Sequence, residues 1–392
     1  MNRLFKHLLM AVATLVMVFS AVSCDDNNNP IDEDDELYYD VLETFVDKTI
    51  IPTYKAMAEA AINMRKVNNE LKENPTDEKM KEASDAWMAM RIWWEMNEAF
   101  LFGPIGENGY DIDGHIDSWP LELEEIKKII VEKNGNITGA EARDLDNEVI
   151  GFHVAEYLLY RDGASRKVSD LTAAELKYLT AVTDVMVWDC ILAYVSWAGK
   201  DNVTSEMLSV FEENADVVTH YNRYTTYHNY GTKFKNGTAN PSLIETVREI
   251  SVGCSTIAEE VGAVKIREPY DDRATEKVES WYSWHSLDDY CNNIESIKNA
   301  YLGGTNNSNR PSISLSTYIA KVNPELDERV KDKIENCFTK IRAIGKNGSQ
   351  SFYEVVLAKK NGDNSMDEIV DAAADACIEL RDVFSLVDAA IK

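Results

Sequence analysis

An imidazole and a carboxylate stand three residues apart in the stretch Gly151-Phe152-His153-Val154-Ala155-Glu156. Apolar residues recur at helical spacing over about 141–161, which predicts one helix ended by Asp162-Gly163. On such a helix His153 and Glu156 leave the same face. One neutral imidazole with one carboxylate is half of a site for a first-row metal ion. The same pair is also explained by a core histidine hydrogen-bonded to a glutamate one turn on.

Gly151 falls inside this predicted helix. A glycine within a helix costs about 1 kcal/mol relative to alanine. We therefore expect another backbone or a ligand to pass close to Gly151, although a notch for core packing would also explain it.

The helix predicted at 77–101 carries charged residues among large apolar ones, with Arg91 and Glu98 on one apolar face. A buried charge is costly unless it is paired or bound to a ligand. Arg91 and Glu95, four residues apart, could form an ion pair. Glu98 needs another partner, and a cation shared with His153 and the glutamate one turn after it would supply one.

The helix predicted at 273–302 carries polar residues amid aromatic ones. Ser286, Asp289 and Asn293 lie along one stripe, and His285 can reach an aspartate one turn on. Such a density of polar side chains indicates either one wall of a polar cleft or a solvated edge.

The chain has 392 residues, 45% of them hydrophobic, and a formal net charge of −28. This hydrophobic content supports a large buried core. The acidic surface repels phosphate backbones, which argues against binding to nucleic acid.

The other histidines and the cysteines show no ligand spacing. His115, His220 and His228 have no partner at a metal-site distance in the sequence. The cysteines beyond residue 24 are far apart and form no C-x-x-C pair, so we expect buried helical residues rather than a zinc site or a disulfide framework. These cysteines are Cys190, Cys254, Cys291, Cys337 and Cys377.

The N-terminus predicts an exported protein. Arg3 and Lys6 precede an apolar run at 8–22, which is short for a membrane span and typical of a signal peptide. Small residues followed by Cys24 resemble a bacterial lipobox, which would make residues 1–23 the leader and Cys24 the lipidated residue; an ordinary secretory peptide is the alternative. Residues 24–36 read as an acidic tether. We expect no other stretch to be long and apolar enough to span a bilayer, so the sequence predicts a lipid-anchored body in the cell envelope, on the periplasmic face of the outer membrane or at the cell surface.

Helical patterns follow one another from residue 37 without convincing strand alternation. We predict an all-α protein of about ten helices in two bundles packed side by side, covering 37–222 and 223–392. A capping box at Thr172 and Glu175 opens one of these helices. The predicted helices cover 37–73 (interrupted at Pro52), 77–101, 120–133, 141–161, 172–197, 205–222, 241–262, 273–302, 323–344 and 366–390.

Several segments together resemble the imelysin family, also classified as peptidase family M75. Residues 151–156 match its G-x-H-x-x-E signature, residues 91–104 resemble the preceding helix, and residues 117–120 resemble a family loop. Residues 258–280 and 293–303 resemble its C-terminal half. The resemblance implies two related helical bundles with a site between them near the signature helix, in a bacterial envelope protein tied to iron acquisition.

The resemblance makes His153 and Glu156 the site pair and Gly151 the position of close approach, and helix geometry adds Glu98 and Arg91. We expect iron or another divalent cation, or an iron-bearing ligand such as an iron chelate or haem. The predicted metal ligands are His153, Glu156 and Glu98, and the further ligand-binding candidates are Gly151, Arg91, Glu95, Ser286, Asp289 and Asn293.

Three functions fit this pattern. The first is a non-enzymatic binding protein that supplies an envelope iron transporter. The second is a metal-dependent peptidase in which Glu156 polarises a metal-bound water. The third is an adhesin or scaffold with a structural polar core. No H-E-x-x-H, G-x-S-x-G, P-loop or Rossmann fingerprint is present, which favours binding over catalysis.

Overall fold

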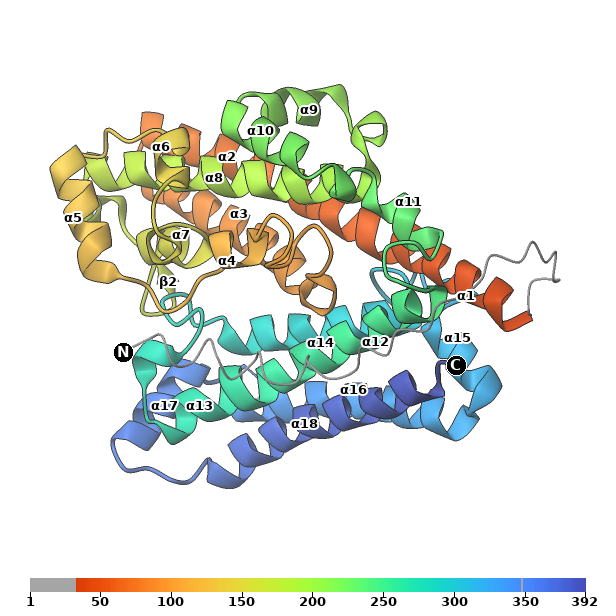
Figure 1. Cartoon of the computed structure of the whole chain (residues 1–392). Helices are drawn as coiled ribbons and strands as arrows, with labels where there is room; N and C mark the ends of the chain where they lie inside the picture. The colour runs from red at the N-terminus through yellow and green to blue at the C-terminus, as the bar shows by residue number, and fades with distance from the viewer. Residues whose placement is uncertain (1–32, 347) are drawn as a thin grey trace. The chain divides into compact units, whose positions relative to one another are not determined.

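Helices dominate the structure, a computed structural model that describes residues 33–346 and 348–392 (Figure 1). The predicted leader, the lipidation site at Cys24 and most of the acidic tether lie outside these residues. From Asp34 to Lys392 the chain forms one unit.

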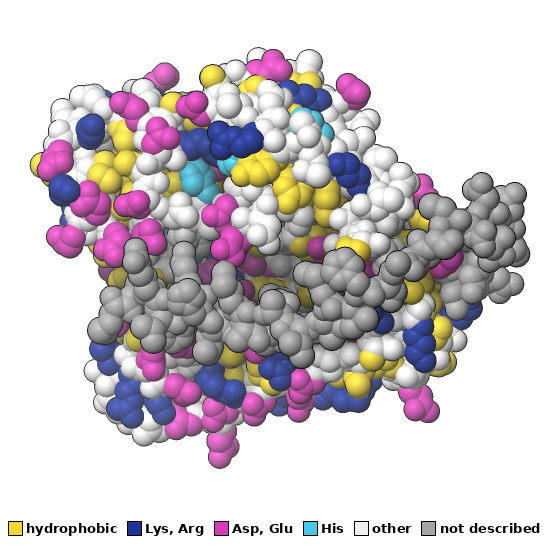
Figure 2. Space-filling view, viewed as in Figure 1, with side chains coloured by type: hydrophobic (Ala, Val, Ile, Leu, Met, Phe, Trp, Pro, Cys, Tyr) yellow, Lys and Arg dark blue, Asp and Glu magenta, His cyan; other side chains and the backbone are white. Residues whose placement is uncertain are grey.

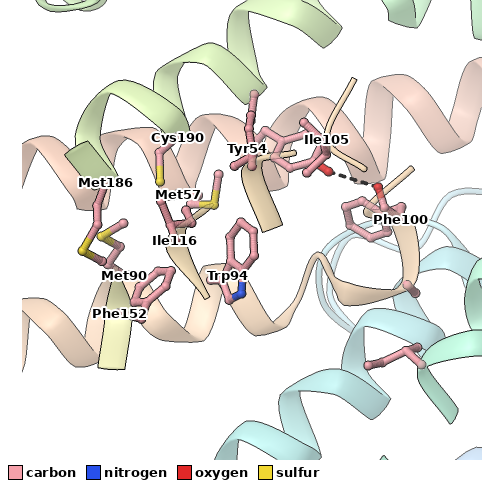
Figure 3. Close-up of a cluster of buried hydrophobic side chains, with 14 of the residues drawn as sticks. Tyr54, Met57, Met90, Trp94, Phe100, Ile105, Ile116, Phe152, Met186 and Cys190 are labelled. Atoms are coloured by element: carbon pink, nitrogen blue, oxygen red, sulfur yellow. Dashed lines mark hydrogen bonds between the residues drawn. The ribbon is translucent and has the colours of Figure 1, made fainter. Parts of the chain in front are cut away.

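One bundle is built on α2 (Ile51–Glu73), α3 (Asp77–Glu95), α7 (Phe152–Leu159) and α8 (Ala173–Ala198). Helix α2 packs against α3 and α8, and α7 packs against the same two helices. Figure 3 shows their side chains meeting in a hydrophobic layer that includes Met57, Met90, Trp94 and Phe152.

The second bundle is built on α12 (Leu243–Glu259), α14 (Ser286–Leu302), α16 (Pro324–Ile344) and α18 (Asp367–Ala390). Helix α18 packs against α12 and α16, and α14 packs against both of these and against α3 of the first bundle (Figure 1). The predicted all-α class with two bundles is confirmed. The boundary at 222/223 stays a prediction.

Helix α8 is the core helix of the first bundle. Its start follows the predicted capping box, in which Thr172 and Glu175 bond each other's backbone N–H. By length and composition α8 could cross a membrane, so the expectation that only the leader would qualify was wrong. However, 94% of the apolar 18-residue stretch of α8 is buried inside the protein, and this burial accounts for the apolar composition of the helix.

The helix predicted at 141–161 is broken into pieces, so that prediction was wrong. It consists of α6 (Gly139–Arg143), a 3₁₀ turn at Asn147–Val149 and α7. Gly151 has φ +84° and stands before the first residue of α7, so it starts a helix rather than interrupting one. After α7 the chain reverses through a short antiparallel pair, β1 (Tyr160–Arg161) and β2 (Ala164–Ser165).

Two further predicted helices are too long. Helix α3 ends at Glu95, and a separate 3₁₀ turn covers Glu98–Phe100. The segment before α14 is not helical, because Ser280 (φ +50°) and Trp284 (φ +64°) have left-handed backbones that no α-helix accommodates. These breaks place Glu98 and Glu279 in turns.

The five cysteines lie buried on α8, α12, α14, α16 and α18, as predicted.

Short helices that the sequence pattern missed or merged complete the structure. The remaining elements are α1 (Glu33–Thr44), α4 (Ile112–Ile116), α5 (Leu123–Lys133), α9 (Ser205–Glu212), α10 (Ala215–Arg223), α11 (Tyr230–Lys235), α13 (Glu268–Asp271), α15 (Leu315–Val322), α17 (Phe352–Lys360), π-helical turns at Phe45–Ile50 and Glu260–Arg267, and 3₁₀ turns at Val168–Asp170, Lys200–Asn202, Thr225–Tyr227 and Thr275–Lys277.

Candidate metal-binding site

The His153 imidazole is fully buried on α7, and its two nitrogens face carboxylates. Nδ1 lies 3.2 Å from Oε2 of Glu156. Nε2 lies 3.3 Å from Oδ1 of Asp117 and 3.8 Å from Oε1 of Glu279. No described residue is aligned to form a hydrogen bond with Nε2. Buried polar atoms without a partner are rare in native proteins, so this nitrogen marks a place where a further group could bind.

Asp117, His153 and Glu279 could together hold a metal ion, because one ligand atom from each lies within 4.8 Å of the others. Asp117 follows α4, and Glu279 lies in the non-helical segment before α14. Two carboxylates and one imidazole suit iron, manganese or zinc. Glu95, Glu98 and Asp117 form a second group with the same spacing.

Glu156 does not lie among these ligand atoms. Its Oε1 accepts hydrogen bonds from the backbone N–H (2.8 Å) and the hydroxyl (2.7 Å) of Ser283, and its Oε2 faces Nδ1 of His153. A carboxylate that holds one imidazole nitrogen leaves the other for a metal ion. The geometry therefore gives Glu156 the position of an orienting residue behind His153.

Arg91 is a fully buried cation at the centre of the site. It pairs with Glu95, the i+4 partner expected from the sequence, and with Asp117. Its Nη2 lies 2.7 Å from Oε1 of Glu279, and its Nε lies 3.6 Å from Oδ2 of Asp289. One guanidinium thus ties two loops and two helices together.

The polar stripe of α14 faces this interior and not a solvated edge. Asp289 and Asn293 are at most 1% exposed. The Asn293 amide donates to the Glu95 carboxylate, and the Ser286 hydroxyl donates to the carbonyl oxygen of Glu279 at 2.5 Å. The stripe is therefore one wall of the polar interior.

Glu98 is not in the ligand group that contains His153, and it faces Lys265, a residue that the sequence pattern did not indicate. Its Oε1 is 3.8 Å from Nζ of Lys265, which also lies 3.4 Å from Glu279 and 3.7 Å from Glu260. Lys265 is in the π-helical turn after α12, a kind of irregularity that is frequent at functional sites.

Carboxylates outnumber cations in this interior, and their pKa values reflect this. Burial raises the pKa of Glu95 and Glu98 well above the usual value despite the nearby Arg91 and Lys265. Burial opposes a charge on His153, but the facing carboxylates of Asp117 and Glu156 outweigh it and raise the His153 pKa to about 9. An additional cation would relieve the repulsion among these buried acids.

The pKa of Asp117 is lowered, in contrast to those of Glu95 and Glu98. Burial raises its pKa, but attraction to Arg91 and to the facing His153 imidazole outweighs burial and holds the pKa below the usual range. Its Oδ2 also accepts a hydrogen bond of 2.6 Å from the Trp94 indole. Asp117 is thus a carboxylate that stays ionised inside the protein.

Gly151 permits a close approach of backbone, as its unusual placement predicted. A Cβ there would lie 2.3 Å from the carbonyl oxygen of Ile116, the residue before Asp117. Gly151 therefore sets the distance between α7 and the Asp117 loop.

A second buried ion cluster lies in the same bundle. Asp189, fully buried on α8, pairs with Arg143 and lies 2.5 Å from Nδ1 of His115. Spacing in the sequence could not reveal this partner of His115, because Asp189 is 74 positions away. Lys, Arg and His side chains lie together near α6 and α10 on the face shown in Figure 2. We interpret the ion pairs of Asp189 with Arg143 and His115 as contacts that hold α4 and α6 against α8.

Comparisons with known proteins agree with this architecture. The family profile described as Imelysin (peptidase M75) matches residues 50–383. An iron-regulated protein A of Synechococcus elongatus is 24% identical over 265 residues, which cover 67% of this chain and 64% of the length of that relative.

Two solved structures resemble the whole chain. A Parabacteroides distasonis protein, provisionally named an iron-regulated protein A precursor, is 28% identical with a TM-score of 0.70, covering 91% of this chain and 96% of its own. An imelysin-like protein of Psychrobacter arcticum is 11% identical with a TM-score of 0.58, covering 92% and 95%. The second comparison supports the fold alone.

Proposed function

The chain belongs to the imelysin family, and from that premise we propose that it is a lipid-anchored envelope protein that binds an iron cation for uptake. In this proposal Asp117, His153 and Glu279 are the ligands. Glu156 orients the imidazole, and Arg91 positions the two carboxylates.

One observation carries the proposal. Nε2 of His153 is buried, has no aligned hydrogen-bond partner among the described residues, and faces Asp117 and Glu279. A buried nitrogen left without an aligned hydrogen bond loses up to about 1–3 kcal/mol. A bound cation would remove that cost and would use both facing carboxylates.

The contacts with Arg91 are compatible with a bound ion. A carboxylate has about four lone-pair positions, so Asp117 and Glu279 can each hold the guanidinium and a cation together. An all-protein site for iron commonly combines imidazole and carboxylate in this way. Full burial of His153 and Arg91 favours a bare ion over haem.

The names of two relatives support iron as the cargo. The Synechococcus protein is called iron-regulated, and the Parabacteroides protein carries the same name in provisional form. We extend that association to this chain as part of the proposal, together with delivery to an envelope transporter.

Peptidase chemistry fits this geometry less well. A metallopeptidase needs a carboxylate base that is free to take a proton from metal-bound water. Here Oε1 of Glu156 is held by two donors of Ser283 and Oε2 faces His153. We therefore favour binding.

Anaerobic titration calorimetry with Fe(II), with Zn(II) as a redox-inert probe, tests the proposal. We expect stoichiometric binding that falls at least tenfold in Asp117→Asn and in Glu279→Gln. Glu249→Gln is the matched control, because Glu249 is a half-buried carboxylate that bonds Asn240 away from the site. Wild-type protein that binds neither ion, or variants that bind as tightly as the control, would leave only a structural polar core, as expected of a scaffold.

A further inference from the structure

A cavity of about 650 Å³ lies on the outer side of the segment that carries Glu279 and Ser283. Its walls come from the turn at Gly163, from residues 283–288, and from the end of α16 and the start of α17. Volumes of this size are typical of small-molecule sites. We propose that this cavity, which we call the His285 pocket, binds a small organic polycarboxylate.

His285 supplies an oriented imidazole at the wall of the pocket. Its Nδ1 lies 3.1 Å from Oδ2 of Asp288, one turn on, as the sequence spacing predicted. No described residue bonds its Nε2. Because a carboxylate fixes Nδ1 as the donor side, Nε2 is left to meet a ligand. When protonated, that nitrogen donates to a carboxylate oxygen.

Arg342 supplies the permanent positive charge. Its guanidinium lies 5.2 Å from the centre of the Phe338 ring and forms no ion pair with a carboxylate of residues 33–346 and 348–392. In a chain with 68 acidic and 40 basic residues, an arginine beside a cavity without an acidic partner is unusual. Arginine is the side chain best suited to bidentate binding of a carboxylate.

The two acidic side chains that line the pocket are already engaged. Asp288 holds His285, and Glu354 accepts hydrogen bonds from the backbone N–H (2.8 Å) and the hydroxyl (2.9 Å) of Ser351. Gln350 adds an amide whose oxygen has no hydrogen-bond partner among the described residues. Apart from this amide oxygen, the groups left to meet a ligand are the donors of His285 and Arg342, which match the acceptor oxygens of an anion.

Trp284 forms a fixed apolar wall beside these donors. Its backbone is left-handed (φ +64°), and its indole stacks at 6.4 Å on the Tyr353 ring. A Cβ at Gly163 would come within 2.4 Å of the indole, so only glycine admits it there. A strained residue held this firmly is typical of binding sites.

The pocket adjoins the candidate metal site through one residue. Ser283 lines the pocket and also holds Glu156, which orients His153. If the proposed function is correct, a polycarboxylate in the pocket has the chemistry of an iron chelator placed next to the ion it would deliver. Binding of the anion itself does not depend on that function.

Titration calorimetry with citrate, on metal-free protein, tests the inference. We expect saturable binding that weakens at least tenfold in Arg342→Gln and in His285→Gln. Arg329→Gln is the matched control, because Arg329 lies on the same helix α16 but does not line this pocket. Absence of citrate binding to the wild type, or equal binding by all three variants, would overturn the inference.

The same titration in Asp117→Asn separates this inference from the proposed function. That variant should lose metal binding and keep citrate binding. If citrate binds but Asp117→Asn still binds Fe(II) normally, the metal site is wrong and the pocket stands. If metal binding depends on Asp117 but citrate does not bind, the pocket is wrong and the metal site stands.

Discussion

Glu156→Gln should change which ring nitrogen of His153 carries the proton, while the protein stays folded. In the wild type, the carboxylate accepts only, so Nδ1 of His153 must keep a proton, and a metal ion that displaces the second proton of the charged ring takes the lone pair of Nε2. In the variant, the two donors of Ser283 keep the amide oxygen, because they lie 2.7 and 2.8 Å from Oε1. The amide NH₂ then faces Nδ1, which must accept, and the proton moves to Nε2.

The expected loss follows from this change of tautomer. Removing a partner that orients a metal-binding histidine costs about 10–100-fold in affinity, or about 1.4–2.7 kcal/mol. Fold stability should fall by about 1–2 kcal/mol, because two charge-assisted hydrogen bonds from Ser283 become neutral ones. Metal binding should therefore weaken without unfolding of the protein.

Two measurements check the reasoning. Fe(II) and Zn(II) titrations give the affinity, with Glu249→Gln as the control for loss of a half-buried carboxylate. Nitrogen-15 NMR of labelled histidine, recorded above pH 9 where the ring of His153 is neutral, reports which ring nitrogen keeps the proton. Unchanged affinity with a changed tautomer would show that Nε2 does not bind the ion, and an unchanged tautomer would refute the role given to Glu156.

Three further outcomes follow from the same structure. Gly151→Ala should destabilise the protein by about 1–3 kcal/mol in urea unfolding and weaken metal binding, whereas Gly362→Ala, also at positive φ (+93°) but with nothing within 4 Å of the added methyl, should affect stability alone. Asp189→Ala strands Arg143 and should cost about 3–5 kcal/mol at pH 7. Because attraction to that arginine outweighs burial and lowers the pKa of Asp189, its contribution is present above the ordinary aspartate pKa, so the gap between variant and wild type should shrink as pH falls below about 4 in acid-unfolding scans. Cys24→Ala should change the mass of the processed protein in mass spectrometry, and an unchanged mass would remove the lipid anchor from the proposal.

Local patterns in the sequence predicted the local parts of the site. The capping box at Thr172 fixed the start of α8, and the i, i+4 spacing of Arg91 and Glu95 predicted their ion pair. The i, i+3 spacing of His153 and Glu156 placed the two side chains together. Each of these depends on one helical turn, which sequence spacing determines well.

The ligand-side carboxylates depend on contacts that spacing cannot reveal. Arg91 and Glu279 are 188 positions apart, and Glu279 lies in a turn that was taken for helix. Asp117 and Glu279 both stood in segments that resembled the family, and that was the signal that could have found them. Sequence spacing gave no indication of the direction in which the side chain of Asp117 or of Glu279 points.

The break before α14 comes from residues that give no warning in a sequence. A left-handed glycine is easy to suspect, whereas Ser280 and Trp284 adopt the same region without being glycine. Tertiary contacts must hold them there: the Trp284 indole packs on Gly163 and Tyr353. The Glu279 carboxylate is then directed inward to Arg91.

Residues 279–285 contribute side chains both to the buried site and to the His285 pocket. The left-handed backbones of Ser280 and Trp284 take Glu279 and Ser283 out of the line of α14. The left-handed positions let the inner side of the segment supply both polar groups to the buried site. Its outer side then presents Trp284 and His285 to the pocket. A group bound in that pocket would therefore restrain the segment that holds Glu279, and the two sites should affect each other's affinity reciprocally.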